Sequence, residues 1–434
     1  MNGQPPPDAL FDYDARPVTP QIVLVGTSAS PAAYAIRDFL SRNGCFYDWI
    51  DLDQSGSAQT VVGVNEIDTS LLPLCILPNG SRLAPATVEQ VAAGLGMVAA
   101  PAHSEYDLAI VGAGPAGLAA AVYAASEGLR TVVIEAVAPG GQAGTTSMIE
   151  NYLGFPSGIS GSELATRATS QARRFGAEIL LARSLVEVAP DSPGYVARLS
   201  DGTMVRGHSV LVAAGVDWRR LNVQGIEELL GAGVYYGAGP SEAVACMGSR
   251  VVVVGGGNSA GQAVVRFSSY ARRVTLLVRG HDLRKSMSQY LINRVSSLPN
   301  VDVQTGSAVV GVEGDGRLRQ LLVVSDDGPA ERLPADALFV CIGGTPRTDG
   351  VTEIGLVTDE AGYLVTGSDL GFGPWPGEAW TLPRQPFPLE TNLPGLFAAG
   401  DVRRGSIKRC AAAIGEGAMA VALVHRRLAE VAGE

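Results

Sequence analysis

The chain has 434 residues, a length that suits about two to four domains rather than one. Hydrophobic residues make up 46% of it and charged residues 17%, so it can bury large cores and wholesale disorder is excluded. The formal net charge of −11 argues against a nucleic-acid-binding protein, and the chain lacks the run of about eighteen apolar residues that a membrane helix needs.

The N-terminal part of the chain predicts a flexible tail followed by a small α/β module. Residues 1–19 contain four prolines among polar residues and have neither the basic nor the apolar region of a secretory signal. Residues 20–100 then alternate between strand and helix patterns, and residues 97–106 have the composition of a linker. The expected elements of this module are strands at 21–26, 46–53 and 72–78 and helices at 31–44 and 86–96.

Two later segments, 107–136 and 249–280, share one pattern. Each has an apolar strand, a glycine turn, a helix and a second apolar strand that ends in one charged residue. This is the βαβ unit of dinucleotide-binding folds, used twice in one chain. We therefore predict an α/β protein with two three-layer, Rossmann-like nucleotide-binding domains in addition to the N-terminal module.

The first glycine turn reads Gly112-Ala113-Gly114-Pro115-Ala116-Gly117 and directly follows a predicted strand. In this pattern the first glycine makes a tight turn and the second lets a pyrophosphate approach the backbone, while the third lets the helix pack closely on the strand. The second strand ends about twenty residues later at Glu135, where a carboxylate accepts hydrogen bonds from a ribose. With strand, turn, helix and acid all in place, the segment predicts a dinucleotide site rather than a chance run of glycines.

The second glycine turn reads Gly255-Gly256-Gly257-Asn258-Ser259-Ala260, with alanine in the third position. The strand after it ends in Arg279 instead of an acid, and Arg284 follows. Guanidinium groups pair with a phosphate in a bidentate manner, so this half predicts an NADP(H) site. The alternative is that both arginines belong to a solvated basic surface.

Two nucleotide folds on one chain imply two cofactors that exchange a hydride. The C-terminal segment 396–417 places Gly400-Asp401 between an apolar strand and a helix. In FAD enzymes an acid in this place binds the ribityl chain, and the positive end of the helix faces the pyrimidine end of the flavin. The expected cofactors are therefore FAD and NADPH.

From residue 107 to its end the chain resembles the low-molecular-weight thioredoxin reductase family of NADPH- and FAD-dependent flavoproteins. The motifs occur in family order: GAGPAG, GGQAGTTSMIENYLGFP (140–156), GGGNSA, IGGTPRT (342–348) and FAAGDV. The resemblance implies a homodimer and an FAD domain at 105–220 and 338–434, with an NADPH domain inserted at 221–337. It also implies that the NADPH domain rotates to bring the two cofactors together. By position it assigns these residues to the flavin: Gly141, Gln142, Asn151, Gly400, Asp401, Lys408, Arg409 and Cys410.

One departure from the family concerns its redox centre. The family has a CxxC pair just before the NADPH strand, where this chain has Gly237-Ala238-Gly239-Pro240. A relay from flavin to disulfide needs two thiols, so it cannot run through these four residues. We expect Cys246 to be a small buried hydrophobe and Cys410 to be a packing residue beside the flavin. The cysteines, which we expect to be reduced and to form no zinc site, are Cys45, Cys75, Cys246, Cys341 and Cys410.

Two further departures lie near the C-terminus. Arg409 stands where a flavin-facing glutamine is expected, and a positive charge there would stabilise reduced flavin. A solvent-pointing Arg409 is the alternative. The segment 368–388 is longer than the family loop and includes Trp375 and Trp380. It either covers the flavin or receives a partner, or it packs against its own or the N-terminal domain.

Residues 20–100 weakly resemble a glutaredoxin/thioredoxin-like fold. The resemblance depends on the βαβ opening and on Leu72-Pro73-Leu74, which is placed like the cis-proline strand of that fold. Ser28-Ala29-Ser30-Pro31 stands where the active CxxC would be, so the module is expected to be redox-dead. Such a module would serve dimerisation, docking or ligand sensing.

The sequence therefore predicts a cytoplasmic, homodimeric, NADPH-dependent FAD oxidoreductase of thioredoxin-reductase fold. Hydride would pass from NADPH to FAD and then to an external acceptor, which is a quinone-like small molecule, a ferredoxin-type protein or O₂. Two alternatives stay open: a disulfide reductase that uses unpaired cysteines, and a non-catalytic flavin-binding sensor or scaffold. No metal, nucleic-acid or membrane partner is expected. The sequence does not name the acceptor or a catalytic residue.

Overall fold

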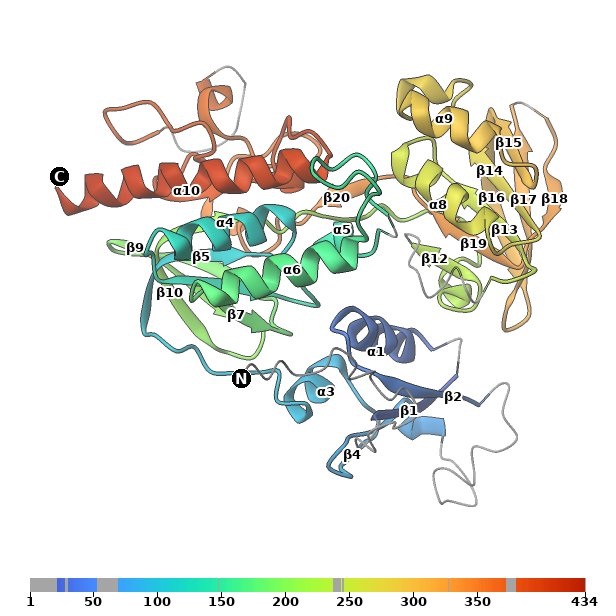
Figure 1. Ribbon diagram of the computed structural model, residues 1–434, viewed down its shortest axis with the longest axis horizontal. Helices are drawn as coiled ribbons and strands as arrows, with labels where there is room; N and C mark the ends of the chain where they lie inside the picture. Colours follow the sequence, from blue (N-terminus) through green and yellow to red (C-terminus); the bar gives the residue numbers. More distant parts are fainter. Residues whose placement is uncertain are drawn as a thin grey trace, which may run out of the picture.

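The computed structural model contains three α/β units, which Figure 1 shows as an N-terminal module and two larger nucleotide-binding folds. The predicted tail at 1–19, Ser28 and Ala29, Gly237 to Pro240, and Trp375 lie outside the part of the chain that the structure describes. The described residues are 22–27, 30–52, 69–146, 148–236, 243, 246–326, 328–371 and 380–433.

The first nucleotide-binding fold has a sheet with strand order β7-β6-β5-β10-β9-β8, and β21 pairs with β10. The strands β7, β6, β5, β10 and β21 are parallel, whereas β9 and β8 form an antiparallel extension. Parallel strands are covered on both faces, which explains why every residue of β6 is buried. The strands are β5 (Glu105–Val111), β6 (Thr131–Glu135), β7 (Glu178–Leu181), β8 (Leu185–Asp191), β9 (Gly194–Leu199), β10 (Met204–Val212) and β21 (Leu396–Ala398).

Three helices cover one face of this sheet: α4 (Pro115–Ser126), α6 (Gly161–Arg174) and α10 (Cys410–Ala432) (Figure 1). Helices α4 and α10 pack closely because their contact is made of small residues. A Cβ atom on Gly417 would lie 2.1 Å from the carbonyl oxygen of Ala116. This packing brings the first turn of α4 next to the first turns of α10, where the sequence predicts the flavin.

The second fold has a parallel sheet of order β12-β19-β13-β14-β15, with helices on one face and a three-stranded antiparallel sheet, β16-β17-β18, on the other. It therefore has the predicted three layers. The strands are β12 (Val234–Tyr236), β13 (Arg250–Val254), β14 (Arg273–Val278), β15 (Val301–Thr305), β16 (Ser307–Gly314), β17 (Leu318–Ser325), β18 (Glu331–Pro334) and β19 (Ala337–Val340). The helices are α8 (Asn258–Ser268) and α9 (Gln289–Ser296).

The two connections between these folds run side by side, since β11 (Val216–Trp218) pairs with β20 (Gly344–Pro346). The predicted domain boundary at residue 338 differs from the structure. Strand β19 pairs with both β12 and β13 up to Val340, so residues 338–340 belong to the second sheet. An apolar run predicts a buried strand, but it does not tell which of two sheets the strand joins.

The N-terminal module has a four-stranded sheet of order β2-β1-β3-β4, in which β1 and β2 are parallel and the other pairs are antiparallel. The Leu72–Pro73 peptide bond is cis. Ser30 caps helix α1 and Pro31 is its first residue, so the described half of the Ser28-to-Pro31 segment begins a helix. The elements are β1 (Ile22–Gly26), α1 (Pro31–Arg42), β2 (Tyr47–Asp51), β3 (Leu74–Ile76), β4 (Arg82–Leu83) and α3 (Val88–Gly94). Assignment to a glutaredoxin/thioredoxin-like fold stays a prediction.

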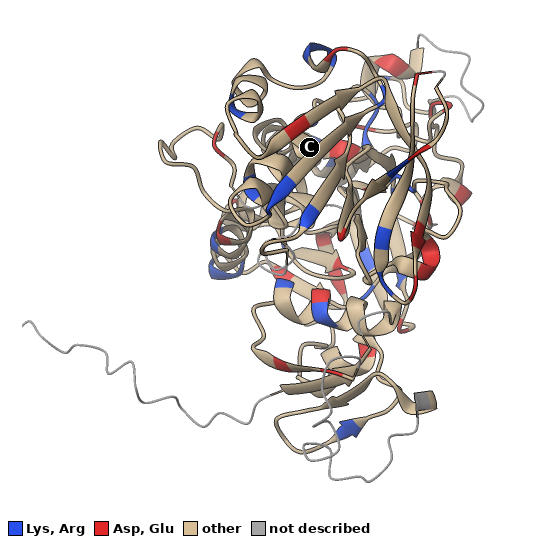
Figure 2. Ribbon diagram, turned by 90° about the vertical axis from the view of Figure 1, so that its right-hand side faces the viewer, with Lys and Arg blue, Asp and Glu red and all other residues tan. Residues whose placement is uncertain are grey.

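The module lies below the two nucleotide-binding folds in both views (Figures 1 and 2).

Within the described ranges, no helix combines the length and apolarity that a membrane crossing requires, and no group of three His, Cys, Asp or Glu residues is arranged to hold a metal. The remaining short elements are α5 (Gly141–Gly144), η1 (Thr69–Leu71), η2 (Glu227–Leu229), η3 (Leu283–Lys285), η4 (Thr352–Ile354), η5 (Gly367–Gly371) and η6 (Gly400–Val402).

Candidate functional site

The three glycines of the first turn have the backbone surroundings that the pattern predicts, and the binding role of Gly114 stays a prediction. Gly112 has φ +101°, and a Cβ atom there would lie 2.5 Å from the carbonyl oxygen of Ala213. A Cβ on Gly117 would lie 1.9 Å from the carbonyl oxygen of Gly112, so only glycine allows α4 to pack on the turn. At Gly114, by contrast, a Cβ would meet no described atom within 4 Å. This open backbone, at the N-terminus of α4, suits a pyrophosphate.

Residues far apart in sequence meet at this turn. Pro115 begins α4, and Ala116 behind it is buried. Gly400 has φ +76°, and a Cβ atom there would lie 3.0 Å from the Cβ of Ala116 and 3.8 Å from that of Ala413 in α10. The first glycine turn and the Gly400 segment therefore form one surface, as the sequence predicts for a flavin site.

Glu135 ends β6 and is buried, but its carboxylate binds the protein's own backbone. One oxygen accepts a hydrogen bond from the amide of Ala113 (2.7 Å), and the other accepts from Val137 (2.9 Å) and Ala138 (3.2 Å). A carboxylate has about four acceptor positions, so one position is left for a ribose hydroxyl. The ribose role stays a prediction, and the structure adds a second role, which is to hold the loop after β6 against the glycine turn.

That loop carries Gly141 and Gln142. Gly140 and Gly141 have φ +103° and +53°, and the amide of Gly140 donates to the carbonyl of Ala113 (2.7 Å). A Cβ on Gly141 would lie 3.1 Å from the Cα of Gly114, so Gly141 borders the open backbone. The Gln142 side chain donates to the carbonyl of Val216 (2.6 Å), which ties the loop to β11.

Asn151 is not brought to the glycine turn by any contact among the described residues. It is exposed, two residues after the bridge between Ile149 and Ile159. Its neighbour Glu150 forms an ion pair with Arg294 of α9 (2.5 Å), which connects the first fold to the second. A flavin contact from Asn151 stays a prediction.

The segment that contains Asp401 is held by Lys408, which the sequence assigned to the flavin, and by Glu416 and Arg403, which it did not. Glu416 of α10 accepts a hydrogen bond from the amide of Gly400 (2.7 Å) and forms an ion pair with Arg403 (2.7 Å). The Lys408 ammonium donates to the carbonyl of Asp401 (2.5 Å) and lies 4.5 Å from the centre of the Tyr363 ring. Burial raises the pKa of Asp401 and lowers that of Lys408, and each group's charge opposes the shift of the other.

Arg409 precedes α10 and is exposed; its guanidinium donates to the carbonyl of Lys408 (2.9 Å). This is the solvent-pointing arrangement that the sequence left as an alternative. A flavin-facing role for this charge stays a prediction.

The thiols are poorly suited to act as nucleophiles near neutral pH. Cys410 begins α10, and burial together with the Asp401 carboxylate raises the pKa of its thiol to about 11. Burial alone raises the pKa of Cys75 to about 11 and that of Cys341 to about 12. Cys246 is buried in the core of the second fold, as predicted for a small hydrophobe. Cys45 and Cys75 contribute to one hydrophobic cluster, and none of the five cysteines, which all lie in the described residues, forms a disulfide.

The second glycine turn repeats the backbone of the first. Gly255 has φ +146°, and a Cβ there would lie 2.2 Å from the carbonyl oxygen of Cys341. Gly257 precedes α8, and the nearest described atom to a Cβ there would be 3.9 Å away. Ala260, in the third position, is fully buried. The open position again lies at a helix N-terminus, which suits a phosphate.

A loop after β14 lies over this second turn. The Ser286 hydroxyl donates to the carbonyl of Gly256 (2.8 Å), and the amide of Ser288 donates to the Asn258 side chain (2.7 Å). Ser259 is exposed beside this contact. Two hydrogen bonds that the glycine motif does not predict therefore hold this loop against the turn.

Arg279 and Arg284 are carried by the same loop and are both exposed. Within the described ranges neither forms an ion pair, so their guanidinium groups are available to a phosphate. Exposure is also what a solvated basic surface would show, and the NADP(H) role stays a prediction.

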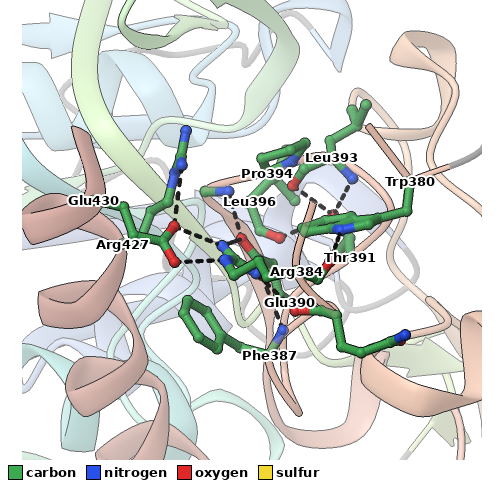
Figure 3. Close-up of polar contacts among 12 residues, drawn as sticks. Trp380, Arg384, Phe387, Glu390, Thr391, Leu393, Pro394, Leu396, Arg427 and Glu430 are labelled. Carbon is green, nitrogen blue, oxygen red and sulfur yellow. Dashed lines mark hydrogen bonds and ion pairs between the residues drawn. The ribbon is translucent and has the colours of Figure 1, made fainter. Parts of the chain in front are cut away.

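The described part of the added segment at 380–388 is anchored to its own domain (Figure 3). Arg384 binds the fully buried Glu390 (2.7 and 3.1 Å) and also Glu430 of α10 (2.5 and 2.9 Å), and Trp380 donates to the Arg384 carbonyl. Glu430 is twenty residues after the start of α10, about 30 Å along the helix. Residues 380–388 therefore pack on the far end of α10 and not over its first turn, where the flavin is predicted.

The described residues fit FAD. Two helix N-termini, an open glycine and a buried carboxylate with one remaining acceptor position meet on one surface. Among the residues that the sequence assigned to the flavin, no described contact brings Asn151 to this surface, and Arg409 is exposed. The assignment of each residue to the flavin stays a prediction.

The sequence pattern of the family described as pyridine nucleotide-disulphide oxidoreductase matches residues 106–417. The chain is 34% identical to the thioredoxin reductase of Listeria monocytogenes over 322 residues, which are 73% of this chain and 91% of that relative. It is 35% identical to the thioredoxin reductase of Listeria innocua over the same length, with the same coverage.

Solved structures of similar fold include the thioredoxin reductase of T. acidophilum, with a TM-score of 0.66 and 27% identity. Another is the thioredoxin reductase of Lactococcus lactis in its FR conformation, with a TM-score of 0.67 and 26% identity. Each comparison covers 75% of this chain and 99% of the other. The family pattern begins at residue 106, so it covers the two nucleotide-binding folds and not the N-terminal module.

Proposed function

The chain belongs to the pyridine nucleotide-disulphide oxidoreductase family, and from that premise we propose an NADPH-dependent reductase that passes electrons to an acceptor outside the chain without a dithiol of its own. It is an NAD(P)H-dependent flavoprotein oxidoreductase with the FAD and NADPH cofactors of thioredoxin reductases. The proposal concerns the second half of the reaction, which is the identity of the electron acceptor. We also propose that it works as a homodimer.

The observation that supports the proposal is the spacing of the cysteines. Nowhere in the 434 residues are two cysteines separated by two residues, and the family position has Gly237-Ala238-Gly239-Pro240. Disulfide exchange proceeds through a thiolate and a resolving thiol. The pKa values of Cys75, Cys341 and Cys410 are raised, so few of these thiols are ionised near pH 7.

The chain's own residues would bind and orient the two cofactors. Gly114, Gly141 and the N-terminus of α4 would hold the flavin pyrophosphate, and Asp401 the ribityl chain. Arg279 and Arg284 would hold the 2′-phosphate of NADPH. Bound FAD supplies the ability to accept a hydride and to release electrons to a second substrate. That substrate would be a quinone-like molecule, a ferredoxin-type protein or O₂.

Disulfide reduction is the second candidate, because the relatives are named thioredoxin reductases. It would require an unpaired cysteine, of which Cys410 lies within the predicted flavin segment 396–417. A flavin-binding sensor without turnover is the third candidate.

Anaerobic stopped-flow mixing with NADPH tests the proposal, with flavin absorbance followed near ~450 nm. We expect rapid bleaching, followed by reoxidation when a quinone, a ferredoxin or O₂ is added. Oxidised thioredoxin and a small aromatic disulfide serve as competing acceptors, in wild-type protein and in a variant with all cysteines replaced by serine.

The three candidates give different results. Reduction of the disulfides by wild type but not by the cysteine-free variant would overturn the proposal in favour of a cysteine-dependent reductase. Bound FAD that NADPH never bleaches would favour the sensor. Unchanged quinone or ferredoxin reduction in the cysteine-free variant would support the proposal.

A further inference from the structure

The N-terminal module contacts the segment that borders the predicted flavin pyrophosphate. Helix α1 ends at Arg42, and its cap residue is Asn43. Both side chains reach residues 137–141, which connect Glu135 to Gln142 in the first nucleotide-binding fold. Arg42 and Gly141 are separated by 99 residues in sequence, so only the docking of the module brings them together.

The backbone of this segment is held from two sides. Its amides bind the first fold: Val137 and Ala138 donate to the Glu135 carboxylate, and Gly140 donates to Ala113. Its carbonyls bind the module. The Asn43 side chain donates to Val137 (3.1 Å), and Arg42 donates to Gly141 (3.1 Å) and, at longer range, to Ala138 (3.5 Å).

The carbonyl of Gly141 depends on Arg42 because helix α5 is short. In a regular helix this carbonyl would accept from the amide of Thr145, but that amide bonds to Gln142 instead (3.3 Å). Asp38, one turn before Arg42, forms an ion pair with its guanidinium (3.5 Å), and the Arg42 side chain is only 22% exposed. A partly buried, charged donor of this kind makes a stronger hydrogen bond than a neutral one.

Apolar packing supports the same docking. Val137 and Ala182 of the first fold pack in the hydrophobic cluster of the module, together with Trp49 and Cys45. The module is therefore attached beside the segment through both apolar burial and hydrogen bonds.

From these contacts we propose that the N-terminal module is part of the flavin site and that Arg42 is a positioning residue for it. Gly141 borders Gly114, since a Cβ on Gly141 would lie 3.1 Å from the Cα of Gly114. By fixing the carbonyl of Gly141, Arg42 fixes the width of the space that receives the pyrophosphate. The inference rests on the proposed function in taking FAD as the ligand.

The test is an equilibrium titration of flavin-free protein with FAD, followed by the change in flavin fluorescence. We expect Arg42→Ala to raise the dissociation constant for FAD by about tenfold or more, the usual effect of losing a charged donor. Arg42→Lys keeps a cation and a donor and should recover part of the affinity. Arg37→Ala is the matched control, because Arg37 lies on the same helix but stacks on Trp49 within the module.

Thermal unfolding of each flavin-free variant shows whether it is folded. If Arg42→Ala does not fold, Asn43→Ala replaces it in the titration, with an expected loss of about threefold from one neutral hydrogen bond. Unchanged FAD affinity in the folded variant would overturn the inference. Equal losses in Arg42→Ala and Arg37→Ala would overturn the positioning role of Arg42, since they would indicate a general effect of the module rather than of the hydrogen bond to Gly141. If wild type bound no FAD, the proposed function itself would fail.

Discussion

The two glycine turns have the same backbone plan but differ at the third position. In the first fold a Cβ on Gly117 would lie 1.9 Å from the carbonyl of Gly112, whereas the second fold has a real Cβ there, on Ala260. The second turn therefore accommodates a buried side-chain carbon at its third position, which the first turn does not. The two turns therefore differ by one methyl group at the third position. That position must be glycine in the first turn and can be alanine in the second.

The folds also differ at the end of the second strand. Glu135 is buried and holds three backbone amides, whereas Arg279 is exposed and holds no ion pair among the described residues. The residues at equivalent positions of the two motifs therefore have different contacts. The acid is part of the fold as well as a candidate ligand, whereas the arginine makes no ion pair with the fold among the described residues.

The largest expected effect is that of Gly117→Ala. The added methyl group overlaps a carbonyl oxygen of the backbone, which cannot move away as a flexible side chain would. We expect a loss of about 3 kcal/mol in the free energy of unfolding and loss of bound FAD. The reverse change in the second fold, Ala260→Gly, should cost about 1 kcal/mol. Urea unfolding measures both, and similar losses would contradict the difference between the turns.

Glu135→Gln should have the next largest effect. The amide side chain has one acceptor oxygen in place of two, so its NH₂ group would face a backbone N–H that has lost its partner. We expect a loss of about 2 kcal/mol in stability. Arg279→Gln, at the equivalent exposed place, should change stability by less than about 0.5 kcal/mol. If the Glu135→Gln protein were as stable as wild type but bound FAD weakly, Glu135 would serve ligand binding and not the stability of the fold.

Arg279→Ala and Arg284→Ala should change cofactor selectivity rather than stability. Each removes a charged donor to the 2′-phosphate, so we expect the preference for NADPH over NADH to fall by about tenfold per substitution. The ratio of kcat/KM for the two nucleotides measures it. If the ratio stayed at its wild-type value, both arginines would belong to the solvated surface.

The smallest expected effect is that of removing the ion pair between Asp336 and Arg250 in the second fold. Asp336 accepts three hydrogen bonds from Arg250 (2.7 to 3.0 Å), which lowers its pKa to about 2. A lowered acid pKa stabilises the fold above about pH 4, and this stabilisation is lost as the pH falls towards 2. Both side chains are about one third exposed, so solvent screening reduces it to about 1 kcal/mol.

Asp336→Asn should therefore lower stability at pH 7 by about 1 kcal/mol, and its difference from wild type should shrink as the pH falls from 4 to 2. Denaturant unfolding at several pH values measures this difference. Asp107→Asn is the matched control in the first fold, where the guanidinium of Arg130 is farther away (3.5 Å). A difference that did not depend on pH would exclude the ion pair as its cause.

Local patterns were sufficient for the segments that carry the motifs. The glycine turns, with the strands and helices at 107–136, 249–280 and 396–417, follow from residues that are neighbours in sequence. The other strands and helices of the two folds were not predicted one by one. The boundary at residue 338 did not, because a buried strand joins a sheet through partners that lie far along the chain.

The residues of the candidate site also include some that a local motif predicts and some that it does not. Gly112, Gly114 and Gly117 were predicted with their separate roles, because each role follows from the absence of a side chain at a fixed place in one motif. Glu416, which holds Gly400, and Arg384, which joins Glu390 to Glu430, were not predicted. A charged residue in a helix or loop has no local signal that identifies its partner.

The sequence by itself determined that two nucleotide-binding turns are present, that one is followed by an acid and the other by arginines, and that no CxxC pair exists. Only the tertiary structure decided what those charges touch. It gave Glu135 two amides of its own loop and one of the glycine turn, and it set Arg42 of the N-terminal module against the carbonyl of Gly141. The reason is that a motif fixes backbone conformation over a few residues, whereas a contact between distant residues exists only after the units have packed.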